Sequence, residues 1–221
     1  MASITKNLCI IVALALGVIL SACGNEARKP AQAPSAAQQA PKVEPQQLPS
    51  IQLYRYGSFP VAKAKELKAE LEKAYPSVSL AAQPIELPEK HYYKPRDRYR
   101  GTGLLDDLMK LRKGGYVLGL TNKIIYNENE ISPTFGIFGI SYQGDSVSII
   151  SSLRPKTLKS LSDDEMQELM LHELGHAFGL PHCKDERCMM VDAEHGNKFA
   201  HTQSFCPSCR DYLNSKGWTL Q

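Results

Sequence analysis

The segment that most constrains this chain begins at His172 and has the form HExxHxxGxxH. Two histidines four residues apart on a helix project from nearly the same face, so His172 and His176 can bind one metal ion, as they could not from a strand. Gly179 lets the chain leave the helix through a conformation that glycine adopts readily, and the turn brings His182 round as a third ligand. Three protein ligands leave the fourth position of a tetrahedral zinc ion open for water, with Glu173 beside it. The motif therefore predicts a catalytic zinc site of a hydrolase.

The residues before the motif predict where its helix begins. Ser162 is a suitable N-cap, Glu165 completes a capping box, and Asp163 and Asp164 lie where the helix dipole favours acids. Apolar side chains then share one face of the predicted helix, with the two motif histidines just off its edge: Met166, Leu169, Met170, Leu174, Ala177 and Phe178. The alternative is a solvated helix face with an ion pair, but the complete motif favours a metal site.

The first residues predict export. Lys6 precedes an apolar run from Leu8 to Leu20, which is shorter than the about 20 residues of a membrane-spanning helix and typical of a secretory signal. Leu20-Ser21-Ala22-Cys23 resembles the lipobox of bacterial lipoproteins, which implies removal of residues 1–22 and lipid attachment to Cys23. Gly24 follows instead of an aspartate, so we expect a periplasm-facing anchor in the outer rather than the inner membrane of the cell envelope. The alternatives are an ordinary signal peptide and an uncleaved anchor.

Beyond Cys23 the chain changes character twice. Residues 23–50 are rich in Ala, Pro and Gln and contain almost no large apolar side chain, so they cannot bury a core and are predicted to be a disordered tether. Residues 51–221 have the length of one domain.

Strand and helix patterns alternate along this domain. We expect strands at 51–56, 78–85, 116–120, 135–142 and 146–151, and helices at 61–74, at 104–113 and through the motif. This alternation predicts an α+β (mixed α/β) fold in which helices cover a mixed, twisted sheet.

One expected strand has a functional interpretation. In zinc peptidases of this layout, the last antiparallel edge strand lies above the cleft and can pair with an extended peptide. We therefore nominate Gly136 to Gly139 as a peptide-binding edge. The alternative is a plain hairpin, turning at Gln143-Gly144-Asp145.

Four cysteines after the motif have spacings typical of metal ligands. Cys183 and Cys188 form a CxxxxC pair, and Cys206 and Cys209 form a CxxC pair. Four thiolates suit a second tetrahedral zinc ion in a closed, structural site. HExxHxxG with a third histidine, an adjacent cysteine, CxM and a terminal CxxC resembles the archaemetzincins, a zinc metallopeptidase family of the metzincin clan.

The resemblance implies a metzincin-like zincin with an active-site helix, a zinc-stabilised C-terminal subdomain and peptide or protein substrates. It implies that Glu173 is the general base and that Met190 is the Met-turn residue beneath the site. It also implies two zinc ions, a catalytic one on His172, His176 and His182 and a structural one on Cys183, Cys188, Cys206 and Cys209.

Alternatives remain for several of these residues. Export would place the cysteines in an oxidising compartment, where Cys206 and Cys209 or a cross-pairing could form a disulfide. Met190 could be core filler, the usual role of methionine. His91, His195 and His201 have no ligand spacing and are interpreted as surface or local hydrogen-bonding residues, with a substrate-pocket role as the alternative for the last two.

Charge says little about a partner. The formal net charge is +3, and acids interrupt the basic residues between Lys90 and Arg100, which predicts a solvated loop and no nucleic-acid binding. We expect a monomeric, lipid-anchored zinc peptidase. The alternatives are a non-catalytic peptide-binding or scaffold lipoprotein and, on the CxxC pair, a thiol oxidoreductase; three ligands together with Glu173 favour the enzyme.

Overall fold

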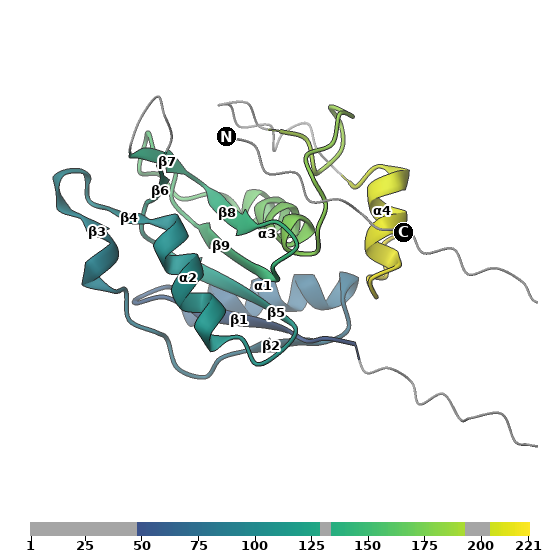
Figure 1. The fold of residues 1–221 in the computed structure, drawn as a ribbon, viewed down its shortest axis with the longest axis horizontal. Coiled ribbons are helices and arrows are strands. Elements are labelled where there is room, and N and C mark those ends of the chain that lie inside the picture. The colour runs from purple at the N-terminus through teal and green to yellow at the C-terminus, as the bar shows by residue number, and fades with distance from the viewer. Residues whose placement is uncertain (1–47, 129–133, 193–203) are drawn as a thin grey trace, which may run out of the picture. The chain divides into compact units, whose positions relative to one another are not determined.

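A computed structural model describes residues 48–128, 134–192 and 204–221 of the chain. Its larger sheet has the strand order β2-β1-β5-β9-β8 (Figure 1). The strands are β1 (Ile51–Arg55), β2 (Val78–Leu80), β5 (Tyr116–Thr121), β8 (Gly139–Tyr142) and β9 (Val147–Ser151). All neighbours pair in parallel except β8, which lies antiparallel to β9 at one edge. The predicted mixed sheet is therefore confirmed.

Helices cover both faces of this sheet. Helices α1 (Val61–Ala74) and α3 (Asp163–Ala177) lie on one face, and α2 (Gly101–Leu111) lies on the other (Figure 1). Because side chains alternate along a strand, Leu118 and Leu120 of β5 join the core beneath α1 and α3, whereas Val117 joins the core beneath α2. The central strands are thus buried on both sides, as in other parallel sheets.

A smaller sheet has the order β3-β4-β6-β7. Its strands are β3 (Tyr92–Tyr93), β4 (Arg98–Arg100), β6 (Ile125–Asn127) and β7 (Phe135–Ile137). The prediction of a solvated loop between Lys90 and Arg100 is wrong for β3 and β4, which pair with each other, while β4 also pairs with β6. The pairing of β4 with β6 joins segments more than twenty residues apart. The pattern of charges along the sequence could not predict it.

Two predicted strands differ from those observed. The strand expected at 78–85 ends at Leu80, and Ile85 forms only an isolated bridge with Tyr56. Pro84, which directly precedes Ile85, cannot donate a backbone hydrogen bond to a sheet. The strand expected at 135–142 is divided at Phe138 between the two sheets: β7 pairs with β6, and β8 pairs with β9. The turn at Gln143-Gly144-Asp145 does join β8 to β9, with Gly144 at a φ of +79°.

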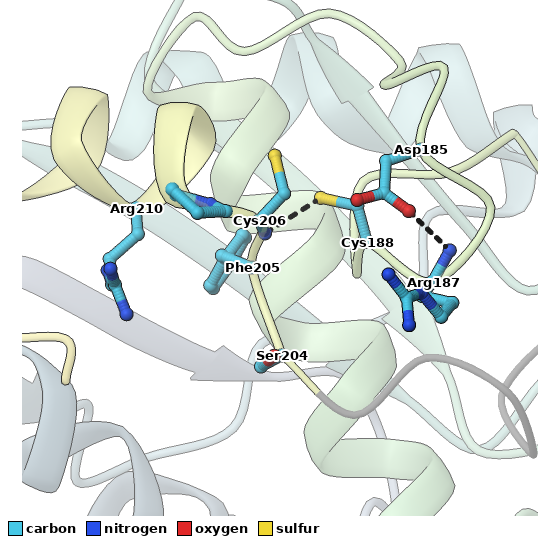
Figure 2. Close-up of a pocket in the computed structure, with 8 residues that line it drawn as sticks. Asp185, Arg187, Cys188, Ser204, Phe205, Cys206 and Arg210 are labelled. Atoms are coloured by element: carbon cyan, nitrogen blue, oxygen red, sulfur yellow. Dashed lines mark hydrogen bonds between the residues drawn. The ribbon is translucent and has the colours of Figure 1, made fainter.

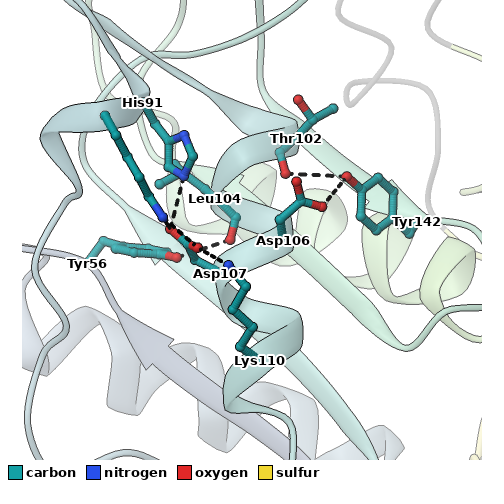
Figure 3. Close-up of polar contacts among 9 residues, drawn as sticks. Tyr56, His91, Thr102, Leu104, Asp106, Asp107, Lys110 and Tyr142 are labelled. Atoms are coloured by element: carbon teal, nitrogen blue, oxygen red, sulfur yellow. Dashed lines mark hydrogen bonds and ion pairs between the residues drawn. The ribbon is translucent and has the colours of Figure 1, made fainter.

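The predicted helix 61–74 has the observed bounds of α1, but α2 begins three residues earlier than expected. Glycine at 103 is required there, because a Cβ atom would lie 2.3 Å from Nδ1 of His91. His91 is buried rather than on the surface, and its Nε2 lies 3.0 Å from Oδ2 of Asp107, the local hydrogen bond expected for it (Figure 3).

The C-terminal residues pack onto the core of the domain. Helix α4 (Pro207–Asn214) contributes Leu213, and Trp218 follows it into the core that contains Phe178 of the motif. The ring centroids of Phe178 and Trp218 are 5.2 Å apart. Among the described residues, no helix combines the length and apolarity needed to cross a membrane.

Candidate active site

The helix that carries the motif begins as its sequence predicts. The Ser162 hydroxyl accepts a hydrogen bond from the backbone N–H of Glu165, and Oε2 of Glu165 accepts one from the backbone N–H of Ser162 at 2.8 Å. Arg154 forms an ion pair with Glu165. The capping box therefore fixes the residue at which α3 begins.

The helix ends so that the third histidine turns back toward the first two. Gly179 has a φ of +107°. Its N–H donates a hydrogen bond to the carbonyl oxygen of His176 at 2.8 Å, and the N–H of Leu180 donates one to the carbonyl oxygen of Gly175 at 2.9 Å. This is a Schellman C-cap, which glycine favours because it has no Cβ. One ligand nitrogen each from His172, His176 and His182 consequently lies within 4.8 Å of the other two.

In two of the imidazoles a hydrogen bond at Nδ1 orients the ring so that the two Nε2 atoms face each other. Nδ1 of His172 lies 2.7 Å from Met189 O, and Nδ1 of His176 lies 2.7 Å from Leu180 O. A carbonyl oxygen only accepts, so each Nδ1 carries the proton and each neutral ring presents an Nε2 lone pair. Burial lowers the pKa of both histidines, which favours these neutral rings.

The two Nε2 atoms are 3.1 Å apart. Two facing lone pairs repel unless a cation lies between them. Nitrogen ligands of a tetrahedral zinc ion are roughly 3.3 Å apart, given Zn–N distances of about 2.0–2.1 Å. The residues present therefore fit a zinc ion, and their outer hydrogen bonds are those that orient zinc ligands.

Glu173 lies beside this cluster and is buried, with 6% of its surface exposed. Its Oε2 accepts a hydrogen bond of 2.5 Å from the hydroxyl of Ser141 on β8. Burial raises the pKa of Glu173, while the hydrogen bond from Ser141 and the nearby histidines oppose that rise. A carboxylate with a raised pKa is suited to accepting and returning a proton.

Met190 lies beneath the motif helix and is fully buried. Its sulfur is 2.4 Å from the position that a Cβ atom would occupy on Gly175, so only glycine allows this approach. The backbone of the same turn supports the site, because the preceding residue, Met189, provides the carbonyl that orients His172.

The four cysteines form a second cluster. Their sulfur atoms all lie within 4.8 Å of one another, and Sγ of Cys183 is 3.8 Å from Sγ of Cys206. Ligands of a tetrahedral zinc at about 2.3 Å would be roughly 3.8 Å apart, so the cluster fits such an ion. The backbone N–H of Cys206 also donates to Sγ of Cys188 at 3.3 Å (Figure 2).

The environment of Cys206 favours a thiolate. Burial alone would raise its pKa, but hydrogen bonds from the Ser208 hydroxyl and the Cys209 backbone, among others, lower the pKa of Cys206 to about 6. Cys188 and Cys206 line a cavity of about 360 Å³ that also includes Arg187 and Arg210 (Figure 2). This edge of the cluster is therefore accessible from the cavity.

Residues 87–215, more than half of the chain, match the family model of Peptidase family M54. The chain belongs to peptidase family M54. Membership of M54 makes it a zinc metallopeptidase, and the archaemetzincin resemblance of its motifs is confirmed.

Curated relatives of this M54 peptidase carry the name archaemetzincin. The protein of Haloquadratum walsbyi is 25% identical over 174 residues, which cover 74% of this chain and 98% of the relative. The protein of Methanopyrus kandleri is 33% identical over 146 residues, which cover 62% and 77% of the two chains.

Solved archaemetzincin structures share the fold of the M54 chain. The crystal structure from Methanopyrus kandleri superposes with a TM-score of 0.64 at 23% identity, covering 78% of this chain and 97% of that one. The structure from Archaeoglobus fulgidus, complexed with malonate, gives a TM-score of 0.61 at 22% identity, covering 73% and 99%.

The M54 fold brings together every predicted ligand that lies in the described residues: His172, His176, His182, Cys183, Cys188, Cys206 and Cys209. Cys23, His195 and His201 lie outside those residues. Sequence reasoning missed Ser141, which contacts the Glu173 carboxylate from β8, and it nominated Gly139 only as part of a peptide-binding edge, not for its place against that carboxylate. The signal available was a pair of small residues at alternate positions of the expected edge strand.

Proposed function

We propose that His172, His176 and His182 hold the catalytic zinc of this metallopeptidase and that Glu173 is its general base. The observation that carries this assignment is the 3.1 Å separation of two Nε2 atoms whose opposite nitrogens both lie against carbonyl oxygens. A bound zinc ion lowers the pKa of a coordinated water from about 15.7 towards about 7 and polarises the scissile carbonyl.

The chain's own residues handle the proton. Ser141 donates a hydrogen bond to Oε2 of Glu173, and the Glu173 carboxylate is assigned to accept a proton from the attacking water. The raised pKa of Glu173 lets the carboxyl hold that proton and then deliver it to the leaving amine. Its burial excludes bulk water from the transfer.

Strand β8 suits the binding of an extended peptide. It is the antiparallel edge of the larger sheet, and its hydrogen bonds to β9 leave its other side free of strand partners among the described residues. Main-chain pairing along such an edge aligns a peptide without reading its side chains. Of the nominated residues Gly136 to Gly139, Gly139 lies beside Glu173, so a paired peptide would pass close to the general base.

A second zinc ion, bound by the four cysteines, is proposed to stabilise the C-terminal part of the domain. Its support is the convergence of all four sulfur atoms on one point, which suits a single tetrahedral ion better than two separate disulfides. Metal analysis with thiol counting would decide: we expect two zinc ions per chain, and about one zinc with no free thiols would favour disulfides.

We further propose that this peptidase works as a monomer tethered to the bacterial envelope by lipid on Cys23, after removal of residues 1–22, with residues 23–50 as the tether. The support is the lipobox-like sequence and the apolar run before it. The periplasmic face of the outer membrane is the expected location, and peptides or proteins there are the expected substrates.

Digestion of a peptide library, read by mass spectrometry, tests the catalytic assignment. Wild-type protein should cleave a subset of peptides, Glu173→Gln should keep its zinc but lose cleavage by about 10²- to 10⁴-fold, and His176→Ala should lose both. Full cleavage by Glu173→Gln would refute the role of Glu173.

A further inference from the structure

The edge strand β8 makes two contacts with Glu173 from a single face. Gly139 and Ser141 are two residues apart, so their Cβ directions point to the same side of the strand. Both face α3 at the position of Glu173. The strand proposed to bind the peptide is therefore also the strand that contacts the general base.

The hydroxyl protons of two serines can be assigned. Ser148 Oγ lies 2.9 Å from the Glu173 carbonyl oxygen and also 2.9 Å from Ser141 Oγ, and Ser141 Oγ lies 2.5 Å from Glu173 Oε2. Each hydroxyl has one proton to donate. The shortest contact, to the charged acceptor, takes the proton of Ser141, and the proton of Ser148 then satisfies the carbonyl.

Gly139 defines the other side of the carboxylate. A Cβ atom at this position would lie 2.5 Å from Oε1 and 2.7 Å from the carboxylate carbon of Glu173. No side chain can fit there without displacing the carboxylate. Glycine at 139 therefore makes the space in which the Glu173 head group lies.

We propose that Ser141 is a positioning residue for Glu173: its hydroxyl fixes Oε2 within the space left by Gly139, so that the carboxylate keeps a single orientation in which to take the proton of the reacting water. This inference rests on the proposed role of Glu173 as general base. A freely rotating glutamate would place either oxygen in several directions, and a fixed one avoids that loss of alignment in every turnover.

The competing explanation is that Ser141 has a purely structural role. Ser141 Oγ and Ser148 Oγ both lie within hydrogen-bond distance of the Glu173 main-chain carbonyl, at 2.8 and 2.9 Å, and so connect the sheet to α3. Ser148 provides the matched control. It is fully buried and contacts the same carbonyl and the Ser141 hydroxyl, but its own hydroxyl makes no hydrogen bond to the carboxylate.

The test compares kcat, KM, zinc content and thermal unfolding of wild type, Ser141→Ala, Ser141→Thr and Ser148→Ala. Ser141→Ala should lower kcat by about 10- to 100-fold with KM and zinc content unchanged, and Ser141→Thr should restore most of kcat because it keeps the hydroxyl. Ser148→Ala should lower the melting temperature at least as much as Ser141→Ala while retaining kcat within about threefold.

Wild-type kcat in Ser141→Ala, or equal losses of kcat in the two alanine variants, would overturn the proposal. A crystal structure of Ser141→Ala gives an answer that does not depend on turnover: the Glu173 carboxylate should leave its place beside Gly139, and an unmoved carboxylate would refute positioning by Ser141. If wild-type protein cleaves no peptide, the proposed function fails, and the crystal structure still decides the positioning role. Should Ser141→Ala not fold, Gly139→Ala tests the same alignment, and wild-type kcat in that variant would also count against it.

Discussion

Replacing Cys206 by serine should weaken zinc binding at the three histidines as well as at the cysteines. The backbone N–H of Cys206 donates a hydrogen bond to Sγ of Cys188. Met189, the residue after Cys188, provides the carbonyl that orients Nδ1 of His172. The Cys183 N–H bonds Met190 O at 2.7 Å and so ties the residue after His182 to the same turn. The two clusters therefore share one support.

The expected magnitude follows from these contacts. Mutating a residue that orients a metal ligand costs about 10- to 100-fold in metal affinity, which corresponds to about 1.4–2.7 kcal/mol. Loss of the cysteine-bound ion should free the Met189 carbonyl, which orients His172, and Cys183, which adjoins His182. Because two histidines are affected, we expect a loss of zinc affinity in the upper half of that range.

The assay is the zinc concentration that restores half-maximal peptide cleavage to metal-depleted protein. Cys206→Ser should need about 30- to 100-fold more free zinc than wild type. Ser208→Ala is the control, because it removes a hydroxyl near Cys206 Sγ but leaves all four thiols. If Cys206→Ser loses the second zinc but recovers activity at the wild-type concentration, the two sites are independent and the reasoning is wrong.

Four further predictions follow from single contacts. Ser162→Ala removes the N-cap of α3 and should lower the free energy of unfolding by about 1 kcal/mol, measured by urea denaturation. Gly179→Ala should cost more, about 1–3 kcal/mol, since φ is +107° and the new Cβ would lie 2.7 Å from Tyr212 Oη; a loss below that of Ser162→Ala would contradict it. Burial alone would raise the pKa of Asp107, but hydrogen bonds from Lys110, Lys90 and His91 hold that pKa well below its usual range. The ionised carboxylate therefore stabilises the fold above pH ~4, and this contribution is lost as the pH falls through the lowered pKa. The difference in melting temperature between wild type and Asp107→Asn should shrink below pH ~4. Cys23→Ser should move the protein from the membrane fraction to the soluble fraction or leave its signal uncleaved, and unchanged fractionation with normal processing would refute lipidation.

Features encoded in short segments could be predicted from the sequence. The capping box at Ser162 and the glycine turn after α3 depend on residues three to six positions apart, and both occur as expected. The same holds for the motif histidines, whose helical spacing alone brings two of them together. Local spacing was sufficient because the helix itself supplies the geometry.

Features that depend on distant segments were not predictable. The division of the strand expected at 135–142 depends on which partner strand each half meets, β6 or β9. The contact of Ser141 with Glu173 joins residues 32 positions apart, and the burial of His91 depends on its approach to Gly103 of α2. Periodicity reports the type of element, but it does not report the partner against which the element packs.

Anomalous diffraction at the zinc absorption edge, on crystals of the protein purified with its metal, tests the central claim most directly. We predict one peak about 2.0–2.1 Å from a nitrogen of each of His172, His176 and His182, and a second about 2.3 Å from the four cysteine sulfurs. An absent peak at the histidines, in protein that still cleaves peptides, would contradict the assignment of the catalytic zinc.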